Sequence, residues 1–227
     1  MFFGDTTRND ILKLYFNATA IANIADNAAA SPLTNLYFGL HSAWPGSAAN
    51  QTTNEISYTG YARVAAARTS GGFTVTANAV SPVATVSFGQ CTAGSATAMF
   101  ATIGTASSGT GKIIGIGTIG GAPQIASAAT SDTITAYAHG LTTDDRVVFY
   151  PGYNVTLPTG ITEGTVYFVR GTGLTTDTFT VATTSGGAAV DVTGAAGMIL
   201  QKVTPMSITS SPATTPQLTT STVFRLF

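Results

Sequence analysis

The pattern of apolar and polar positions along this chain alternates with the period of two that is typical of β-strands. Residues 35–41 place Leu36, Phe38 and Leu40 at every second position. Three apolar side chains therefore lie on one face of an extended segment. The opposite face, which carries His41, can stay in contact with water, so we expect a half-buried strand.

Further strand-like segments follow at regular spacing, with Gly-rich turns between them. They lie at 61–68, 73–78, 85–88, 99–104 and 113–119. The turn at 107–111 predicts that the last two segments form a hairpin. Short strands in this arrangement are typical of an antiparallel β-sandwich or a jelly roll. We therefore predict a mainly β protein with a sandwich or jelly-roll-like base domain.

One helical pattern stands at the beginning of the chain. Ile11, Leu14 and Tyr15 recur at helical spacing, and Thr7 resembles the first residue of a capping box. We expect a single N-terminal helix from about Arg8 to Ala22. This helix can be a lid over one end of the β-core, or an arm that docks on a neighbouring subunit.

A long polar segment of about twenty residues separates the first two strands, which is more than an ordinary hairpin loop needs. It carries the only tryptophan of the chain and two tyrosines, and two phenylalanines stand close to the other end of the chain. Aromatic residues on loops are enriched at protein interfaces. The candidate interface residues are Trp44, Tyr58, Tyr61, Phe224 and Phe227. Alternatively, the two tyrosines fix the loop to its own sandwich.

Composition changes the picture mainly through the shortage of charge. Charged residues make up 8% of the chain and the net charge is -1, whereas soluble proteins average roughly 25% charged residues. Such a surface favours association over dispersal. We therefore expect a chain that packs against other chains, and the alternative is a monomeric secreted β-domain.

Four motifs in the first half of the chain resemble small virion structural proteins of tailed bacteriophages. They are L-H-S-A-W-P-G at 40–46, Y-T-G-Y-A-R-V at 58–64, I-G-T-A-S-S-G-T-G at 103–111 and the strand at 112–119. Trp44 stands where those relatives usually have an acidic residue. Members are called tail, fibre or decoration proteins. The resemblance therefore implies a virion component more firmly than a place on the virion.

The resemblance also implies an inserted domain. In the relatives, a strand like 112–119 is followed almost at once by a short terminal stretch rich in Val, Thr and Pro, which here resumes only near Lys202. We therefore predict a base domain from 1–120 and 201–227, with an insert at 121–200. Such an insertion is tolerated where the two ends of the inserted domain lie close together on a surface hairpin.

The insert has a recognisable opening of its own. Residues 138–147 resemble the H-G-L-x-x-G-D-x-V opening of small β-modules of phage capsid and fibre proteins, with Asp144 in place of the usual Gly. Asp tolerates turn positions better than most residues. We therefore predict a small β-barrel-like domain that projects outward from the base.

The residues that carry chemistry are few and scattered. His41, His139 and Cys91 are not placed beside a recognisable nucleophile or base, and Glu55 and Glu163 fall in separate predicted domains. We therefore predict no catalytic, cofactor-binding or metal-binding residues. The nine basic residues are scattered along the chain and form no basic stripe, which argues against nucleic acid as a partner. Apolar stretches are too short to span a membrane, and the first residues do not resemble a signal peptide.

These observations predict a non-enzymatic virion structural protein. The preferred hypothesis is a capsid decoration (cement) protein on the capsid surface, which binds the major capsid protein, stabilises the head and forms a homotrimer or another symmetric oligomer. The alternative is a tail or fibre component whose insert binds a host receptor or a host-surface glycan. The first is preferred because repeated modules and heptads, which fibres usually show, are not found. A third hypothesis is a cell-surface enzyme or lectin that shares only these β-modules with the phage proteins.

Overall fold

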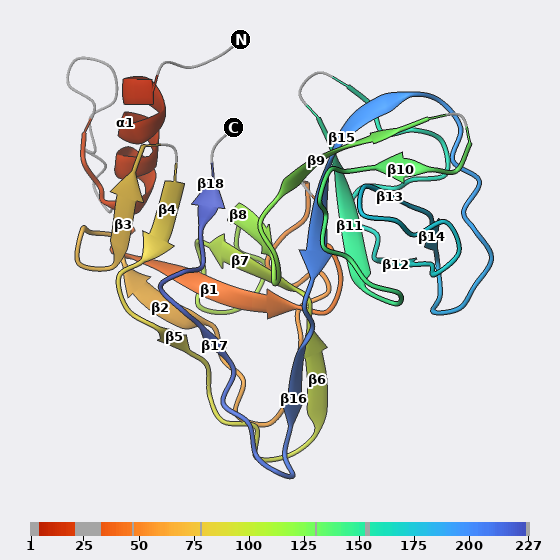
Figure 1. Cartoon of the computed structure of the whole chain (residues 1–227). Coiled ribbons are helices and arrows are strands. Elements are labelled where there is room, and N and C mark those ends of the chain that lie inside the picture. The colour runs from red at the N-terminus through yellow and green to blue at the C-terminus, as the bar shows by residue number, and fades with distance from the viewer. Residues whose placement is uncertain are drawn as a thin grey trace. The chain divides into compact units, whose positions relative to one another are not determined.

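The computed structural model describes residues 5–20, 33–46, 48–77, 79–129, 131–152 and 155–225. Contacts within the chain divide it into two compact units. Unit 1 contains Met1–Gly117 and Met206–Phe227, and unit 2 contains Thr118–Pro205. Figure 1 shows the elements of both units. That residues 121–200 fold as an independent insert stays a prediction.

The central sheet of unit 1 has four strands in the order β2-β1-β7-β8. Their bounds are Asn35–His41 for β1, Val64–Ala67 for β2, Phe100–Gly104 for β7 and Ile113–Thr118 for β8. β1 is antiparallel to both of its neighbours, with Leu36 opposite Ala66 and Leu40 opposite Ala101. The predicted alternation in β1 is confirmed for its apolar face, because Leu36, Phe38 and Leu40 are all buried.

The C-terminal segment of unit 1 runs antiparallel to residues 79–98 in three short pairings. β16 (Met206–Thr209) pairs with β6 (Ser95–Ala98), β17 (Gln217–Leu218) pairs with β5 (Val86–Ser87), and β18 (Phe224–Arg225) pairs with β4 (Ala79–Pro82). The register is the same throughout, with Met206 opposite Ala98 and Phe224 opposite Val80. β3 (Phe73–Thr76) completes the sheet β18-β4-β3.

The single helix of the described residues, α1 (Asp5–Phe16), packs beside β3, where the Phe16 and Phe73 rings meet edge to face at 5.1 Å. Its predicted bounds are wrong. It begins before Thr7, so Thr7 is not its N-cap, and Ala18 has a φ of 53° just after its end. A left-handed residue ends a helix. Residues 21 and 22 lie outside the described residues. No described helix is long and apolar enough to cross a membrane.

Phe38 is at the centre of the core of unit 1. Its ring stacks on Phe73 at a centroid distance of 5.8 Å and contacts Phe224 at 6.5 Å. The Phe224 ring lies against Gly117 of β8, where an added Cβ would come within 3.2 Å of the ring. The C-terminal segment therefore contributes to the same core as β1 and α1.

Unit 2 is a seven-stranded antiparallel sheet in the order β13-β10-β9-β15-β11-β12-β14. The bounds are Gln124–Ala128 (β9), Ile134–Thr135 (β10), Arg146–Pro151 (β11), Tyr167–Val169 (β12), Thr178–Phe179 (β13), Val181–Ala182 (β14) and Ala196–Val203 (β15). Its two outermost strands, β13 and β14, are joined by the single residue Thr180. The sheet is therefore a nearly closed barrel. Phe149, Tyr167 and Phe179 pack in its interior.

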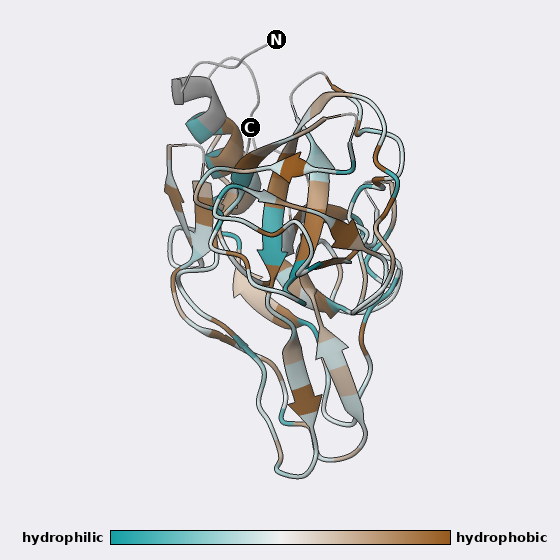
Figure 2. Cartoon of the chain, turned by 45° about the vertical axis from the view of Figure 1, so that its right-hand side comes forward, coloured by the Kyte–Doolittle hydropathy of each residue, from teal (hydrophilic) through white to brown (hydrophobic). Residues whose placement is uncertain are grey.

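The mainly β class, with antiparallel sheets, one N-terminal helix and a barrel-like second unit, is confirmed for the described residues. The jelly-roll description of the base stays a prediction. Figure 2 shows most connecting loops in intermediate colours, neither strongly hydrophilic nor strongly hydrophobic. This fits a chain in which Ser, Thr, Ala and Gly take the place of charged residues.

Candidate functional site

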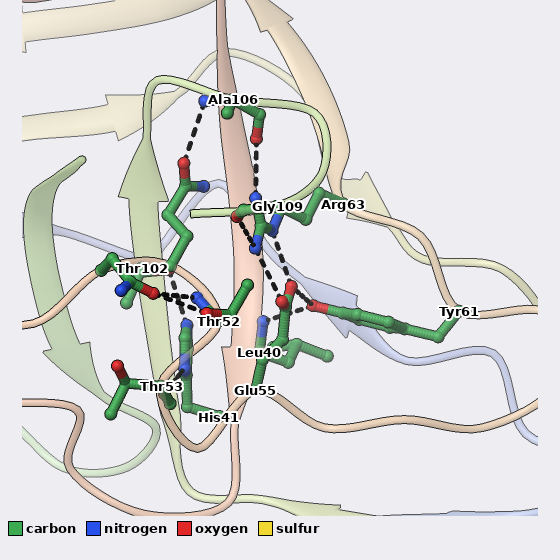
Figure 3. A network of polar contacts seen from close by, with 12 residues as sticks. Leu40, His41, Thr52, Thr53, Glu55, Tyr61, Arg63, Thr102, Ala106 and Gly109 are labelled. Atoms are coloured by element: carbon green, nitrogen blue, oxygen red, sulfur yellow. Dashed lines mark hydrogen bonds and ion pairs between the residues drawn. The ribbon is translucent and has the colours of Figure 1, made fainter. Parts of the chain in front are cut away.

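Glu55 and Arg63 form a buried ion pair in the long loop between β1 and β2 (Figure 3). Arg63 Nε donates to Glu55 Oε1 and Arg63 Nη2 donates to Glu55 Oε2, each at 2.7 Å. The Arg63 side chain is 2% exposed and that of Glu55 is 15% exposed. Two parallel charge-assisted hydrogen bonds fix orientation as well as distance. The pair therefore ties the middle of the loop to the start of β2.

The same guanidinium holds the turn between β7 and β8. Arg63 Nη1 donates to the carbonyl of Ala106 at 3.0 Å, and Nη2 donates to the carbonyl of Gly109 at 2.9 Å. Gly109 lies in the turn that the sequence predicts at 107–111, and Ala106 directly precedes it. Arg63 therefore joins the loop, the start of β2 and the β7–β8 turn through one side chain.

Tyr61 connects this ion pair to the central sheet. Its hydroxyl donates to Glu55 Oε1 at 2.9 Å and accepts the main-chain N–H of Leu40 at 3.0 Å. Burial raises the pKa of Tyr61 well above its ordinary value. The hydroxyl therefore keeps its proton and remains a donor to Glu55.

His41 is fully buried, so the expectation that its side of β1 faces water is wrong. Its Nδ1 lies 2.9 Å from the carbonyl of Thr53, and its Nε2 lies 2.9 Å from the hydroxyl of Thr102 on β7. The loop covers this side of the strand. A histidine beside a hydroxyl resembles a base beside a nucleophile, but His41 and Thr102 are both 0% exposed. The pair acts as a cross-link between loop and sheet.

Gln51 is a fully buried polar side chain within the loop itself. Its side-chain Oε1 accepts the N–H of Ala106 at 2.9 Å, and the main-chain N–H of Gln51 donates to the carbonyl of Gly111 at 2.9 Å. A Cβ on Gly104 or Gly111 would lie within 2.1 Å of the Gln51 side chain. Glycine at these two positions therefore makes the room in which Gln51 holds the turn.

The candidate interface residues are placed differently from one another. Trp44 is half-buried and meets Phe100 edge to face at 5.7 Å. Tyr58 is buried and donates to the carbonyl of Gly89 at 2.7 Å, and Tyr61 is half-buried. Both tyrosines therefore fix the loop to its own unit, which was the alternative role considered for them.

The two phenylalanines near the end of the chain complete the set of candidates. Phe224 is buried in the core of unit 1 and is 8% exposed. Phe227 lies outside the described residues. The structure brings Tyr58 and Tyr61 together, with ring centroids 5.4 Å apart. Trp44 instead packs on Phe100, and Phe224 lies in the core. A role at an interface between chains stays a prediction for all five.

The phage-module motif of unit 2 forms a tight turn before β11. The main chain of Asp144 has a φ of 67°, the left-handed conformation that Gly adopts freely. Asp145 accepts the N–H of Thr142 at 2.7 Å and the ammonium of Lys202 at 2.7 Å. His139 Nδ1 accepts the N–H of Leu141 at 2.9 Å. These three polar contacts hold the turn and the neighbouring strand within unit 2.

Two side chains of unit 2 were missed by sequence reasoning. Ile125 is 87% exposed and Tyr137 is 82% exposed, which makes them the most exposed large hydrophobic residues of the described chain. The only sequence signal was an aromatic residue between two alanines just before the H-G-L motif. Such exposed apolar side chains mark candidate contact sites when they stand together.

The polar side chains of the described residues are used mainly to hold the long loop. No group of three or more His, Cys, Asp and Glu side chains in this part of the chain is placed to hold a metal ion. The buried polar side chains of the loop are instead engaged in holding it against β1 and β7. These features define a β-structural protein with a clamped loop and a barrel-like second unit.

Comparison with known families gives the class a more definite identity. Residues 3–144 match the family described as Podophage GP4 fiber I protein gp80, and the chain belongs to this family. It is therefore a structural protein of a tailed-phage virion, of the tail or fibre kind, and the predicted family resemblance is confirmed. No curated protein matches the chain. No solved structure matches it either.

Proposed function

We propose that this chain is a non-enzymatic tail or fibre component in which unit 1 joins the virion and unit 2 contacts the host surface. The observation that carries the proposal is the match of residues 3–144 to a phage fiber family. This finding favours the tail or fibre alternative over capsid decoration, which was the preferred hypothesis from sequence. The match covers nearly all of the first segment of unit 1, which ends at Gly117, and the beginning of unit 2 up to residue 144.

The geometry of unit 1 supports a role as a base. Its longest described loop is held by an ion pair, two buried polar side chains and two tyrosines, so the loop presents a fixed surface. A fixed surface loses little conformational entropy on binding. A unit of this kind is suited to permanent attachment inside a virion.

Unit 2 has the properties expected of a contact module. It is a nearly closed barrel with its own apolar core, and it displays Ile125 and Tyr137 to solvent. We propose a host receptor or host-surface glycan as its partner. For the whole chain we propose self-association into a homotrimer or another symmetric oligomer, and no nucleic-acid or membrane partner.

The number of copies of this chain in purified particles tests the location. Quantitative mass spectrometry would compare it with the major capsid protein. A few copies per hundred capsid subunits agree with a tail or fibre component. A ratio near one, or a fixed fraction such as one third, would overturn the proposal in favour of a decoration protein bound to the major capsid protein.

Adsorption of phage to host cells tests the role of unit 2. The purified full-length protein, added to the cells first, is expected to slow adsorption in proportion to its concentration. The same protein after heat denaturation is the control. Adsorption that is unchanged at saturating protein would argue against host contact by this chain, whatever its copy number.

A further inference from the structure

We propose that unit 2 binds a neutral glycan at a site formed by the ring of Tyr137, the main chain of Ile125 and the carboxylate of Asp177. This inference rests on the proposed function, since it names the class of ligand through which unit 2 contacts the host. The three residues come from the β10–β11 connection, from β9 and from the segment just before β13. The site lies on the outside of the barrel.

The Tyr137 ring is presented by a turn that Asp177 holds at both sides. Ala136 donates its N–H to the main-chain carbonyl of Asp177 at 2.9 Å, and Ala138 donates its N–H to Asp177 Oδ1 at 2.8 Å. Ala138 has a φ of 49°, which turns the chain back immediately after the tyrosine. The ring is 82% exposed on a fixed main chain, so binding costs little ordering of the turn.

The main chain of Ile125 has an open hydrogen-bonding edge. Ala129 donates its N–H to Thr133, and Ser127 stands opposite Thr135 in the β9–β10 pair. In an antiparallel strand, the main-chain N–H and C=O groups of every second residue point toward the same neighbouring strand. The N–H and C=O of Ile125 therefore also point toward β10, but β10 ends at Thr135. The register gives Ile125 a partner on β15, which is Ile199, and none on β10.

Tyr137 and Ile125 lie at the same end of this strand pair. Tyr137 comes two residues after Thr135, and Ile125 comes two residues before Ser127, while Thr135 and Ser127 are directly opposite each other. Ala126 and Ala136 are buried and face the interior of the barrel. Neighbouring residues of a strand point to opposite faces, so Ile125 and Tyr137 face outward. An exposed ring and an open main-chain edge therefore border the same outer surface.

The mixture of groups decides which ligand fits. A sugar offers C–H faces to an aromatic ring and hydroxyl groups to a main-chain donor and acceptor. A purely apolar protein surface would bury the Ile125 N–H and C=O without partners, at a cost of roughly 1–3 kcal/mol each. A glycan satisfies both kinds of contact at once.

Asp177 decides the charge of the ligand. Its Oδ1 is used by the turn, and its Oδ2 takes part in none of the hydrogen bonds between described residues. An ionised carboxylate accepts hydrogen bonds and donates none, so Oδ2 can receive a sugar hydroxyl. The same negative charge repels sialylated, sulfated or phosphorylated sugars. The site is therefore complementary to an uncharged glycan.

A glycan array probed with the full-length protein tests the proposal. The array carries neutral oligosaccharides of glucose, galactose, mannose and N-acetylglucosamine beside their sialylated and sulfated counterparts. Binding to at least one neutral structure and weaker binding to its acidic counterpart are expected. Saturation-transfer NMR with the bound neutral sugar should show contact through its C–H protons. Absence of any neutral binder, or preference for acidic ones, would overturn the proposal.

Matched variants locate the site. Tyr137→Ala should weaken binding at least tenfold, and Tyr137→Phe should retain it because the ring is kept. Tyr15→Ala, the same change at an exposed tyrosine of unit 1, should leave binding unchanged. Asp177→Asn keeps an acceptor for Ala138 and should admit the acidic counterparts. Equal binding by Tyr137→Ala and the unchanged protein would overturn this site, while copy number and adsorption would still test the proposed function separately.

Discussion

Arg63 binds both carboxylate oxygens of Glu55 at 2.7 Å, in a chain in which only 8% of the residues are charged. The two residues lie eight positions apart and belong to a loop that the sequence predicts only as long and polar. Two further bonds from the guanidinium reach Ala106 and Gly109. One side chain therefore sets the shape of the loop and of a distant turn together.

Breaking this ion pair should destabilise unit 1 strongly. Removal of one partner leaves the other charge buried and unpaired, which typically costs about 3–5 kcal/mol. We expect that loss in the free energy of unfolding of Arg63→Met, measured by chemical denaturation. Lys202→Met removes an ion pair with a 40% exposed lysine side chain, and it should cost less than about 1 kcal/mol. Equal losses in the two variants would contradict the assignment.

The stability of the protein should fall between neutral and mildly acidic pH because of His41. Burial lowers the pKa of His41 below its ordinary value of 6.5, although the Thr53 carbonyl and the charge of Glu55 oppose the shift. Below that pH the unfolded chain binds a proton that the folded chain does not. The free energy of unfolding therefore decreases as pH falls, by at most about 1.4 kcal/mol per pH unit for one group.

His41→Gln separates this effect from the carboxylates. The variant cannot bind that proton and should show a flatter profile between pH 7 and pH 5. Asp145 acts in another range: burial raises its pKa, but its hydrogen bonds from Lys202 and Thr142 outweigh burial, and the net pKa is below the ordinary 3.8. Its contribution is lost only as pH falls below that value. A slope between pH 7 and 5 that is unchanged in His41→Gln would contradict the prediction.

Local pattern was enough to predict the strands but not the loop. Leu36, Phe38 and Leu40 alternate within seven residues, and alternation is a property of adjacent positions. The burial of His41 depends on Thr102, which lies 61 residues further along the chain. A period of two cannot show that a loop folds back over the polar face of the strand.

The candidate site was predictable to a smaller extent. The motif around Asp144 could be recognised from its spacing, because the turn is built from neighbouring residues. The exposure of Tyr137 could not be predicted, since the turn that presents it is held by Asp177, which lies 39 residues after Ala138. Phe224 likewise lies in the core because β18 pairs with β4 across most of the chain.

Gly60 should be the least replaceable glycine of the long loop. It has a φ of 105°, and an added Cβ would come within 2.1 Å of the carbonyl of Gln90. Gly46 has a similar φ of 92° with open space around it. Gly46→Ala should therefore cost the left-handed penalty of about 1–2 kcal/mol, and Gly60→Ala should cost about 1–3 kcal/mol more. Thermal unfolding of both variants measures the difference.

Asp144 should tolerate glycine and reject a β-branched residue. Its φ of 67° lies in the region that Gly adopts freely and that Val adopts only with strain. Asp144→Gly should change the free energy of unfolding by less than about 0.5 kcal/mol, because an exposed contact with Ser185 is lost while the strain is relieved. Asp144→Val should cost more than about 1 kcal/mol. The reverse order would show that the side chain, not the turn, matters here.

Phe149→Ala should loosen unit 2 without loosening unit 1, if residues 118–205 fold as a module of their own. Phe149 is 0% exposed and stacks on Phe179 at 6.5 Å, so a cavity at this place should cost about 3–5 kcal/mol. Hydrogen exchange of the full-length protein is expected to quicken in β11 and β15 and to stay unchanged in β1 and β7. The matched variant is Phe38→Ala, which is expected to act in the opposite unit. Faster exchange in both units after either change would mean that the chain unfolds as one cooperative body and that the predicted insert is not independent.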